Sequence, residues 1–412
     1  MASPSLAAGI RAAGSGRGQG ACASLVATRP SWSNWDAAAH AQQSPRQASW
    51  LGLPAAIYRT RMQAKVDLFR HSVHDANHAR NARNVLYYGT ILLGSHNVSL
   101  NVCFDTGSAD LWVPSQDCDA PSCLAHTRYS YEASTTFQPT PAEFSIRYGT
   151  GAVRGHVALE TVALAQPQLR LTRQSVGLAV ESTADFASAS CDGIFGLALP
   201  ALAKEGGAPA FFRMVEAGML DAPMFAVWLS PDPLAEPAGH VHFGGHERSR
   251  YVGAMHELEV ISTKYWTVAL TGVAVGERRL PALHAEGAIL DSGTSMITAS
   301  DADAAAINQA IPGMRREAGG SSWRLVSGCA AVDALPDITL ELGGFDFALT
   351  PRQYMIMVGG GADAYCISAV VGGGLARRLV LGDTFLRAFY SVLPVSRPLR
   401  SSWRAYENRL SW

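Results

Sequence analysis

The chain has 412 residues, of which 48% are hydrophobic and 16% charged, so it can bury large cores and is not wholly disordered. No long uninterrupted apolar run occurs, which excludes a transmembrane helix. Residues 1–83 have a net charge of +7 and the rest of the chain −8, but the basic part lacks a cluster of Lys and Arg beside aromatic residues, which argues against a nucleic-acid partner.

Residues 1–83 are predicted to form a leader that precedes the folded body. Residues 1–35 contain three Arg and no acidic residue, as a transit peptide does, and they lack a clean secretory signal. Residues 52–72 mix apolar with basic side chains and predict a folded segment. Two interpretations remain open: a targeting peptide, or a detachable segment whose positive charge covers an acidic surface of the body.

From residue 84 onward the sequence predicts a body made mostly of β-strands. Runs rich in Ile, Leu, Val and Tyr predict strands within residues 87–102, 157–178, 224–229 and 338–349. Helical patterns are few, and the best cover residues 210–219, which follow Pro209, and residues 302–311.

The body repeats one pattern twice. Asp-Thr-Gly-Ser at residues 105–108 returns as Asp-Ser-Gly-Thr at residues 291–294, each time after an apolar run. Two apolar residues precede Gly196 and again Gly382, which lie 91 residues after the Asp of their own copy. Matching motifs at equal intervals predict two homologous lobes, which we place at residues 84–247 and 248–412, with an atypical tail at 393–412.

The paired motifs also predict a chemistry. One Asp-Thr-Gly alone is a common turn, but two copies in homologous lobes can meet at the centre. Two carboxyl groups about 3 Å apart cannot both ionise, so they share one proton. The charged member of the pair Asp105 and Asp291 would take a proton from water while the neutral one donates to a substrate carbonyl. The supporting hydroxyl groups are those of Ser108 and Thr294, at the outer carboxylate oxygens, and of Thr106 and Ser292, between the loops.

Five motifs together resemble those of the pepsin-like aspartic endopeptidases, the family of pepsin and cathepsin D, over residues 87–392. They are residues 104–114 and 288–295, the two active-site loops; residues 146–151, the flap hairpin; and residues 192–197 and 380–385, the strands behind the aspartates. The resemblance implies a mainly β, bilobal fold of two β-barrel-like lobes with the active site in the cleft between them. It implies that Asp105 and Asp291 are the catalytic pair. The flap and substrate-binding residues that it implies are Gly107, Ser108, Trp112, Tyr148, Gly149, Thr150, Gly293 and Thr294, with the indole N–H of Trp112 holding Tyr148.

The chain has seven cysteines, an odd number, and disulfides among them would form in an oxidising compartment. Cys118 and Cys123 are close enough in sequence for a small loop disulfide, and the resemblance implies this pair and a second one, Cys329–Cys366. The resemblance puts Cys103 and Cys191 on the wall of the pocket for the residue before the cleaved bond, where we expect them as thiols. Together with Phe186 they predict a preference for bulky apolar residues; the other interpretation is two small buried apolar side chains.

Basic residues in the leader suggest how it is held. Lys65 is the only Lys before Lys204, and the resemblance to family prosegments implies that it lies against the active-site carboxylates. His71, His74 and His78 are expected on one helix face, where their protonation would weaken the hold of the leader.

Three further histidines, His240, His242 and His246, form a spacing that could ligate zinc. No Cys lies nearby and no fourth ligand is evident, so we expect no metal and no cofactor. HExxH and GxSxG motifs are also absent from the sequence, so zinc or serine hydrolase chemistry lacks its usual residues.

The predicted function is the hydrolysis of peptide bonds in proteins by an acid endopeptidase, in which Asp105 and Asp291 activate a water molecule. The alternative is a catalytically inactive, peptide-binding homologue, which is favoured by the tail because an expected Asp and final strand pair do not follow Val392.

The expected partners are protein or peptide substrates and the chain's own prosegment, with no nucleic acid and no membrane span, and the protein is expected to be a monomer. The disulfide pairs favour the secretory pathway, with a vacuolar, lysosomal or extracellular destination. The acid-poor start of the leader points instead to a plastid or a mitochondrion.

Overall fold

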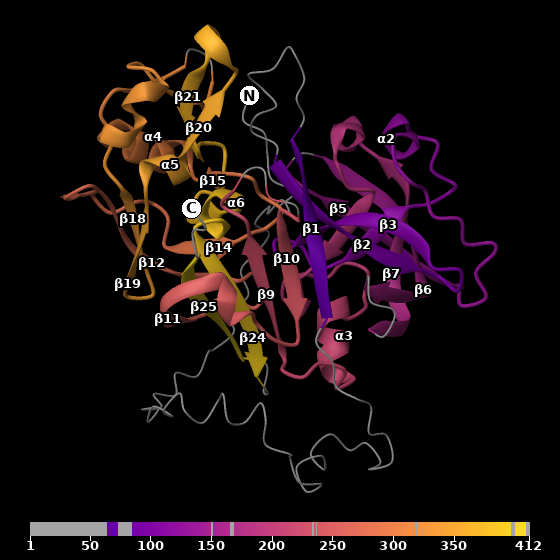
Figure 1. Ribbon diagram of the computed structural model, residues 1–412. Coiled ribbons are helices and arrows are strands. Elements are labelled where there is room, and N and C mark those ends of the chain that lie inside the picture. The colour runs from indigo at the N-terminus through magenta and orange to yellow at the C-terminus, as the bar shows by residue number, and fades with distance from the viewer. Residues whose placement is uncertain are drawn as a thin grey trace, which may run out of the picture. The chain divides into compact units, whose positions relative to one another are not determined.

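The computed structural model describes residues 64–72, 85–149, 151–164, 169–232, 235, 237–317, 320–396 and 400–408. All of them belong to one compact unit, and most of its regular structure is β (Figure 1). No helix among these residues is long and apolar enough to cross a membrane.

The largest sheet contains 13 of the described strands and takes strands from both predicted lobes. In spatial order they are β11 (Tyr251–Glu259), β25 (Arg400–Asn408), β24 (Phe389–Ser396), β9 (Met224–Leu229), β10 (Gly239–Phe243), β1 (Ala64–Ser72), β2 (Val85–Leu93), β3 (Val98–Asp105), β8 (Gly193–Gly196), β4 (Leu111–Pro114), β7 (Arg170–Ser182), β6 (Ala152–Leu164) and β5 (Gln138–Arg147).

Two smaller sheets lie within the second predicted lobe. The first contains β19 (Phe345–Leu349), β18 (Ile338–Leu342), β12 (Thr267–Val275), β14 (Gly287–Leu290), β23 (Arg378–Leu381), β15 (Ile297–Thr298) and β22 (Val370–Val371), with β13 (Arg278–Arg279) beside β12. The second contains β16 (Met314–Arg316), β17 (Trp323–Leu325), β21 (Tyr365–Ser368) and β20 (Met355–Val358).

Short helices connect the strands. The α-helices are α2 (Pro121–Leu124), α3 (Ala210–Glu216), α4 (Asp301–Ala310), α5 (Pro351–Tyr354) and α6 (Asp383–Leu386). The 3₁₀ helices are η2 (Ala184–Ser188), η3 (Pro200–Leu202), η4 (Arg248–Arg250), η5 (Cys329–Ala334) and η6 (Gly361–Asp363).

The strands and helices expected from the sequence are present. The expected strand regions correspond to β2 with β3, β6 with β7, β9, and β18 with β19, and the second expected helix corresponds to α4. Helix α3 begins at Ala210 as expected but ends at Glu216. It stops there because Gly218 adopts a φ of 62°, a left-handed conformation that ends a helix.

The sequence repeat corresponds to a repeat of the fold. In the first copy, β3 is parallel to β8, and β4 is antiparallel to β8 and parallel to β7. In the second copy, β14 is parallel to β23, and β15 is antiparallel to β23 and parallel to β22. Each Asp-containing loop starts where the first of these strands ends, so the two loops have equivalent places in their lobes.

One hydrophobic core continues across the predicted lobe boundary. The rings of Phe211 and Phe225 lie 4.8 Å apart between their centroids, and Phe225 meets the ring of Trp266 at 5.7 Å. Trp266 is fully buried, and its indole N–H donates a hydrogen bond to the carbonyl of Leu197 at 2.9 Å. The first and second halves of the body are therefore fixed to one another by packing.

Part of the predicted leader lies inside the largest sheet. Residues 64–68 of β1 pair with β10, and residues 69–72 pair with β2 (Figure 1). Val66 is buried in the main core. In the ladder of β1 with β10, Lys65 lies opposite His242. His71 is on strand β1, so the expectation that it lies on a helix face is wrong. His74 and His78 lie outside the described residues.

The tail beyond Val392 forms the strand pair that its atypical sequence did not predict. Strand β24 pairs with β9 and with β25, and β25 pairs with β11. Tyr406 lies opposite Tyr390 in this ladder. Arg404 is 9% exposed and its guanidinium lies 3.4 Å from the carboxylate of Glu257. The tail therefore lies within the sheet, with β25 between β24 and β11.

Candidate active site

Two buried aspartates stand at equivalent strand ends. Asp105 is the last residue of β3, Asp291 follows β14, and both are fully buried. Oδ1 of Asp105 accepts the backbone N–H of Gly107 at 2.8 Å, and Oδ2 accepts the hydroxyl of Ser108 at 2.5 Å. Asp291 repeats the pattern at 2.8 and 2.6 Å, with Gly293 and Thr294 as the donors. All four carboxyl oxygens thus have fixed directions.

Two hydroxyl side chains tie the loops to each other. Oγ1 of Thr106 donates to the carbonyl of Leu290 and accepts from the backbone N–H of Ser292, both at 2.9 Å. Oγ of Ser292 donates to the carbonyl of Phe104 at 2.7 Å and accepts from the backbone N–H of Thr106 at 3.1 Å. The four bonds are reciprocal, so each loop holds the other in place.

Ser292→Ala is expected to lower the free energy of unfolding by about 2 kcal/mol, because it removes two buried hydrogen bonds worth about 1 kcal/mol each. Ser292→Thr keeps the hydroxyl and serves as the matched control. Urea unfolding followed by tryptophan fluorescence measures the difference. Equal stability of the Ala and Thr variants would show that these bonds do not hold the loops together.

The two carboxyl groups are electrostatically coupled. Burial is the largest cause that raises the pKa of Asp105 well above its ordinary value, and the charge of Asp291 is the second. The hydrogen bonds from Ser108 and Gly107 lower this pKa, and a hydrogen bond with Asp291 raises it. A Cβ at Gly107 would lie 2.5 Å from Oδ1 of Asp291, so the contact requires Gly. Such a pair holds one shared proton and can act as acid and base at once.

The predicted flap is the turn between β5 and β6. The backbone N–H of Tyr148 donates to the carbonyl of Gly151 at 2.7 Å and closes the turn. The Tyr148 side chain is buried, and its hydroxyl accepts the indole N–H of Trp112 at 2.7 Å. Burial first, and the charge of Asp105 second, raise the pKa of Tyr148. Gly149 is in the same turn, whereas Thr150 lies outside the described residues.

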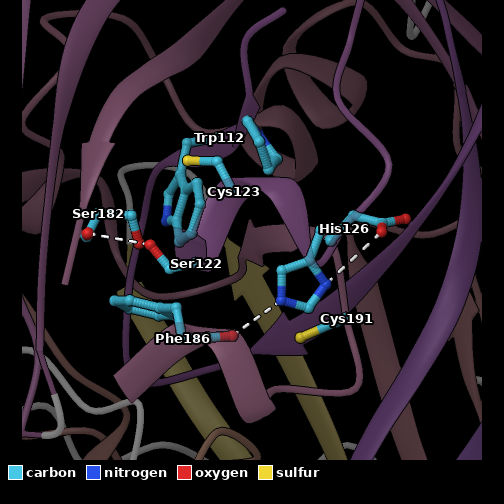
Figure 2. A pocket seen from close by; sticks show the side chains of 9 residues that line it. Trp112, Ser122, Cys123, His126, Ser182, Phe186 and Cys191 are labelled. Carbon is cyan, nitrogen blue, oxygen red and sulfur yellow. Dashed lines mark hydrogen bonds and ion pairs between the residues drawn. The ribbon is translucent and has the colours of Figure 1, made fainter. Parts of the chain in front are cut away.

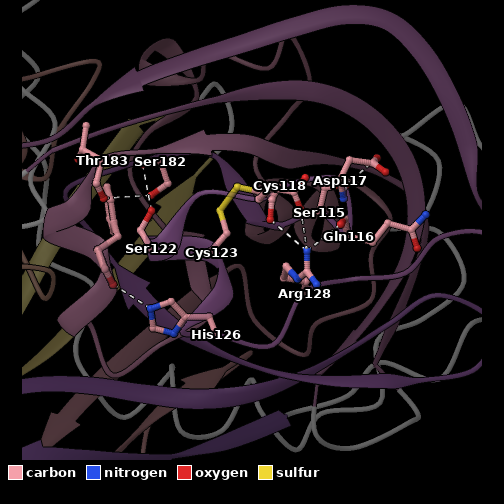
Figure 3. Close-up of a disulfide and its surroundings, with 12 residues drawn as sticks. Ser115, Gln116, Asp117, Cys118, Ser122, Cys123, His126, Arg128, Ser182 and Thr183 are labelled. Atoms are coloured by element: carbon pink, nitrogen blue, oxygen red, sulfur yellow. Dashed lines mark hydrogen bonds and ion pairs between the residues drawn. A yellow bond between two sulfur atoms is a disulfide. The ribbon is translucent and has the colours of Figure 1, made fainter.

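Three disulfides are present among the described residues. Two join the pairs that the resemblance implied, Cys118–Cys123 and Cys329–Cys366. Figure 3 shows the first of them, which joins the loop before α2 to Cys123 within that helix. The third joins Cys103 to Cys191. The expectation of two thiols is therefore wrong: β3 is paired with β8, and Cys191 lies just before β8, which brings the two sulfur atoms together.

Tyr265 lies near the aspartate pair although the sequence offers no reason to expect it there. Its hydroxyl is buried, and burial first, then the charges of Asp291 and Asp105, raise its pKa to about 12. It packs in a cluster with Ala109 and Ile289, which flank the two loops. No motif in the sequence marks this tyrosine, because only the packing of the two predicted lobes brings it near Asp105 and Asp291.

Of the histidines considered as zinc ligands, His240 and His242 lie on β10 and His246 lies in the turn after it. Within the described part of the chain, no group of three His, Cys, Asp or Glu side chains is arranged to hold a metal ion.

Comparison with known proteins points to one family. The sequence model of the family described as eukaryotic aspartyl protease matches residues 86–398. The chain is similar to a vacuolar aspartic protease of Candida albicans, with 33% identity over 77% of this chain and 74% of the relative. It is similar to cathepsin E of Rattus norvegicus, with 32% identity over 74% and 76%, and to vacuolar protease A of Aspergillus fumigatus, with 33% identity over 79% of both chains.

Proposed function

The chain belongs to the eukaryotic aspartyl protease family and is an aspartic-type endopeptidase, and on this premise we propose that Asp105 and Asp291 are its catalytic pair. The expected fold class, mainly β and bilobal pepsin-like, is confirmed by the family match and by the strand content. The observation that carries the proposal is the symmetric, buried and coupled arrangement of the two carboxyl groups.

In this mechanism the pair carries a single proton. The ionised carboxylate takes a proton from a water molecule, whose oxygen attacks the carbon of the peptide carbonyl, and the protonated carboxyl group gives its proton to the carbonyl oxygen. The tetrahedral intermediate then collapses as the C–N bond breaks. The leaving nitrogen receives the proton that was taken from water, and a hydroxyl proton of the intermediate returns to the other carboxylate, so the pair again carries one proton. Ser108 and Thr294 keep the outer oxygens in place, and Thr106 and Ser292 keep the two loops in register.

We propose that activity is greatest at acid pH. The mechanism needs one protonated and one ionised carboxyl group, and it stops when both are ionised or both are protonated. Burial and the neighbouring charge raise the pKa of Asp105, which keeps the shared proton on the pair through the acid range. Above that range the pair loses this proton, and cleavage is expected to fall.

The flap is proposed to close over the substrate. Tyr148 and Gly149, with Thr150, would cover the peptide, while Trp112 holds the Tyr148 hydroxyl and Gly107 and Gly293 leave room beside the pair. The apolar cluster beneath the flap contains Trp112, Tyr148, Phe186, Cys103 and Cys191. It supports a preference for bulky hydrophobic residues next to the cleaved bond.

The protein is proposed to act as a monomer in the secretory pathway, with a vacuolar, lysosomal or extracellular destination. Three disulfides fit an oxidising compartment, and relatives carry names of vacuolar proteases. The chain ahead of the body is proposed to act as a prosegment that is attracted to the acidic body at neutral pH and released in acid.

Digestion of unfolded casein or haemoglobin between acid and neutral pH, with and without pepstatin, tests the proposal. We expect cleavage that pepstatin blocks and that is confined to the acid range. A folded, processed protein that binds pepstatin without cleaving would instead be the inactive peptide-binding homologue. That alternative rested on the tail, and β25 now occupies the place of the final strand.

A further inference from the structure

Phe186 supports the flap from below. It lies on η2 and is 6% exposed. Its ring meets the ring of Tyr148 edge-on at 5.8 Å and the ring of Trp112 edge-on at 5.4 Å. Because the indole N–H of Trp112 also donates to the Tyr148 hydroxyl, each of the three aromatic side chains contacts the other two. A shift of η2 would therefore move the surface on which the flap tyrosine rests.

His126 holds η2 through the backbone of the same residue. Its Nε2 lies 2.8 Å from the carbonyl oxygen of Phe186, and Figure 2 shows the imidazole directed at that oxygen, with Cys191 near the ring. A carbonyl oxygen only accepts hydrogen bonds, so we assign the proton to Nε2. The carbonyl also accepts the N–H of Ala189 at 3.0 Å, but that bond is internal to the η2 turn, whereas His126 comes from the segment after α2.

The other side of the imidazole faces Asp192. Nδ1 of His126 lies 3.8 Å from Oδ1 of Asp192, and their side chains are only 10% and 11% exposed. Asp192 accepts backbone N–H groups from Thr127 at 2.8 Å and from Asn101 at 2.9 Å. Asn101 is on β3, four residues before Asp105, and the neighbouring Cys191 is bonded to Cys103 on the same strand. Because Thr127, the neighbour of His126, and Asn101 both donate to Asp192, the segment that carries the imidazole is linked to the strand that carries the first aspartate.

We propose that His126 is a positioning residue of the peptidase. It fixes η2 relative to β3, so that Phe186 holds the Tyr148 side chain in the position that peptide binding requires. The inference rests on the proposed function of Asp105, Asp291 and the flap. Because the contact acts on the flap and leaves the carboxyl pair untouched, its loss should weaken peptide binding more than it slows the chemical step.

The test compares His126→Leu, which fills the space without a donor, with His126→Gln, whose amide can still donate to the Phe186 carbonyl. Loss of one hydrogen bond corresponds to a roughly three- to tenfold effect, so we expect KM of the Leu variant for one peptide substrate to rise by roughly that factor, with kcat nearly unchanged. The Gln variant should recover most of the loss. His156→Gln, an exposed position on β6, is the matched control. His126→Asn, too short to reach the carbonyl, replaces the Leu variant if that variant does not fold.

Thermal unfolding and the affinity for pepstatin are measured on the same proteins. A purely structural role would lower the melting temperature and leave KM and pepstatin affinity unchanged, and this result would overturn the inference. Equal losses in the Leu and Gln variants would overturn it too. If the wild type binds pepstatin but cleaves nothing, the proposed function fails. The role of His126 is then decided by comparing the pepstatin affinities of the His126 variants with that of the wild type. If the wild type itself neither binds pepstatin nor cleaves the substrate, both proposals fail.

Discussion

Asp105→Asn and Asp291→Asn are each expected to lower kcat by roughly 10³- to 10⁴-fold, the upper part of the range for general acid–base catalysis. An amide neither takes a proton from water nor gives one to a carbonyl oxygen, so either substitution removes one of the two roles. The geometry should survive, since the Asn oxygen can accept the N–H of Gly107, which now bonds to Oδ1 of Asp105, and the Asn amide can donate to the Ser108 hydroxyl, which now bonds to Oδ2. Steady-state cleavage of one peptide at its optimal pH measures the loss.

Asp110→Asn is the matched control for this pair of variants. Asp110 is buried, and burial raises the pKa of its carboxyl group as well. It accepts the backbone N–H groups of Lys204 at 2.7 Å and Glu205 at 3.0 Å, and an Asn oxygen can accept the same bonds. Its activity should stay within a few-fold of wild type. Comparable losses in all three variants would mean that Asp→Asn changes damage the lobe, and the catalytic assignment would lose its support.

The architecture around the aspartates was predictable because its signals are local or periodic. Strand β9 covers the residues expected for it, since a short apolar run bounded by turn-forming residues is typical of a buried strand. The two Asp-containing loops could be matched to each other from the sequence because Gly196 and Gly382 lie at equal distances after them. The strand that ends at each aspartate is parallel to the strand that leads to the corresponding Gly, as the repeat implies.

Features that depend on long-range pairing were not predictable in the same way. Whether the leader adds a strand depends on the register of β1 against β10 and β2, which its own sequence does not specify. Cys103 and Cys191 are 88 residues apart, and only the pairing of β3 with β8 brings them together. Tyr265 packs beside the two loops and His126 meets the Phe186 carbonyl, and both contacts come from the tertiary packing of segments that carry no motif.

Glu205→Gln is expected to stabilise the protein at neutral pH, by at least about 2 °C in melting temperature. Glu205 is 7% exposed, and burial, followed by the charge of Asp110, raises its pKa well above the ordinary value. Hydrogen bonds from Gly177 and Ser175 lower this pKa but do not offset the burial. The folded protein therefore keeps a proton that the unfolded chain loses near its ordinary pKa of about 4.3.

The sign of the pH dependence follows from that difference. Below the ordinary pKa, Glu205 is protonated in both the folded and the unfolded chain, so it does not lower the free energy of unfolding. Between the ordinary and the raised pKa, the unfolded chain loses the proton while the folded protein keeps it, so the free energy of unfolding falls as the pH rises. Gln stays neutral, so its advantage over wild type should be small at about pH 4 and larger at about pH 7. Glu216→Gln, at the exposed end of α3, should show no such trend. Thermal melts across this range test it, and an advantage that does not grow with pH would mean that Glu205 does not limit stability at neutral pH. If it does grow, this buried carboxyl makes the folded enzyme more stable in acid than at neutral pH, on the side of the pH scale where we propose that the aspartate pair works.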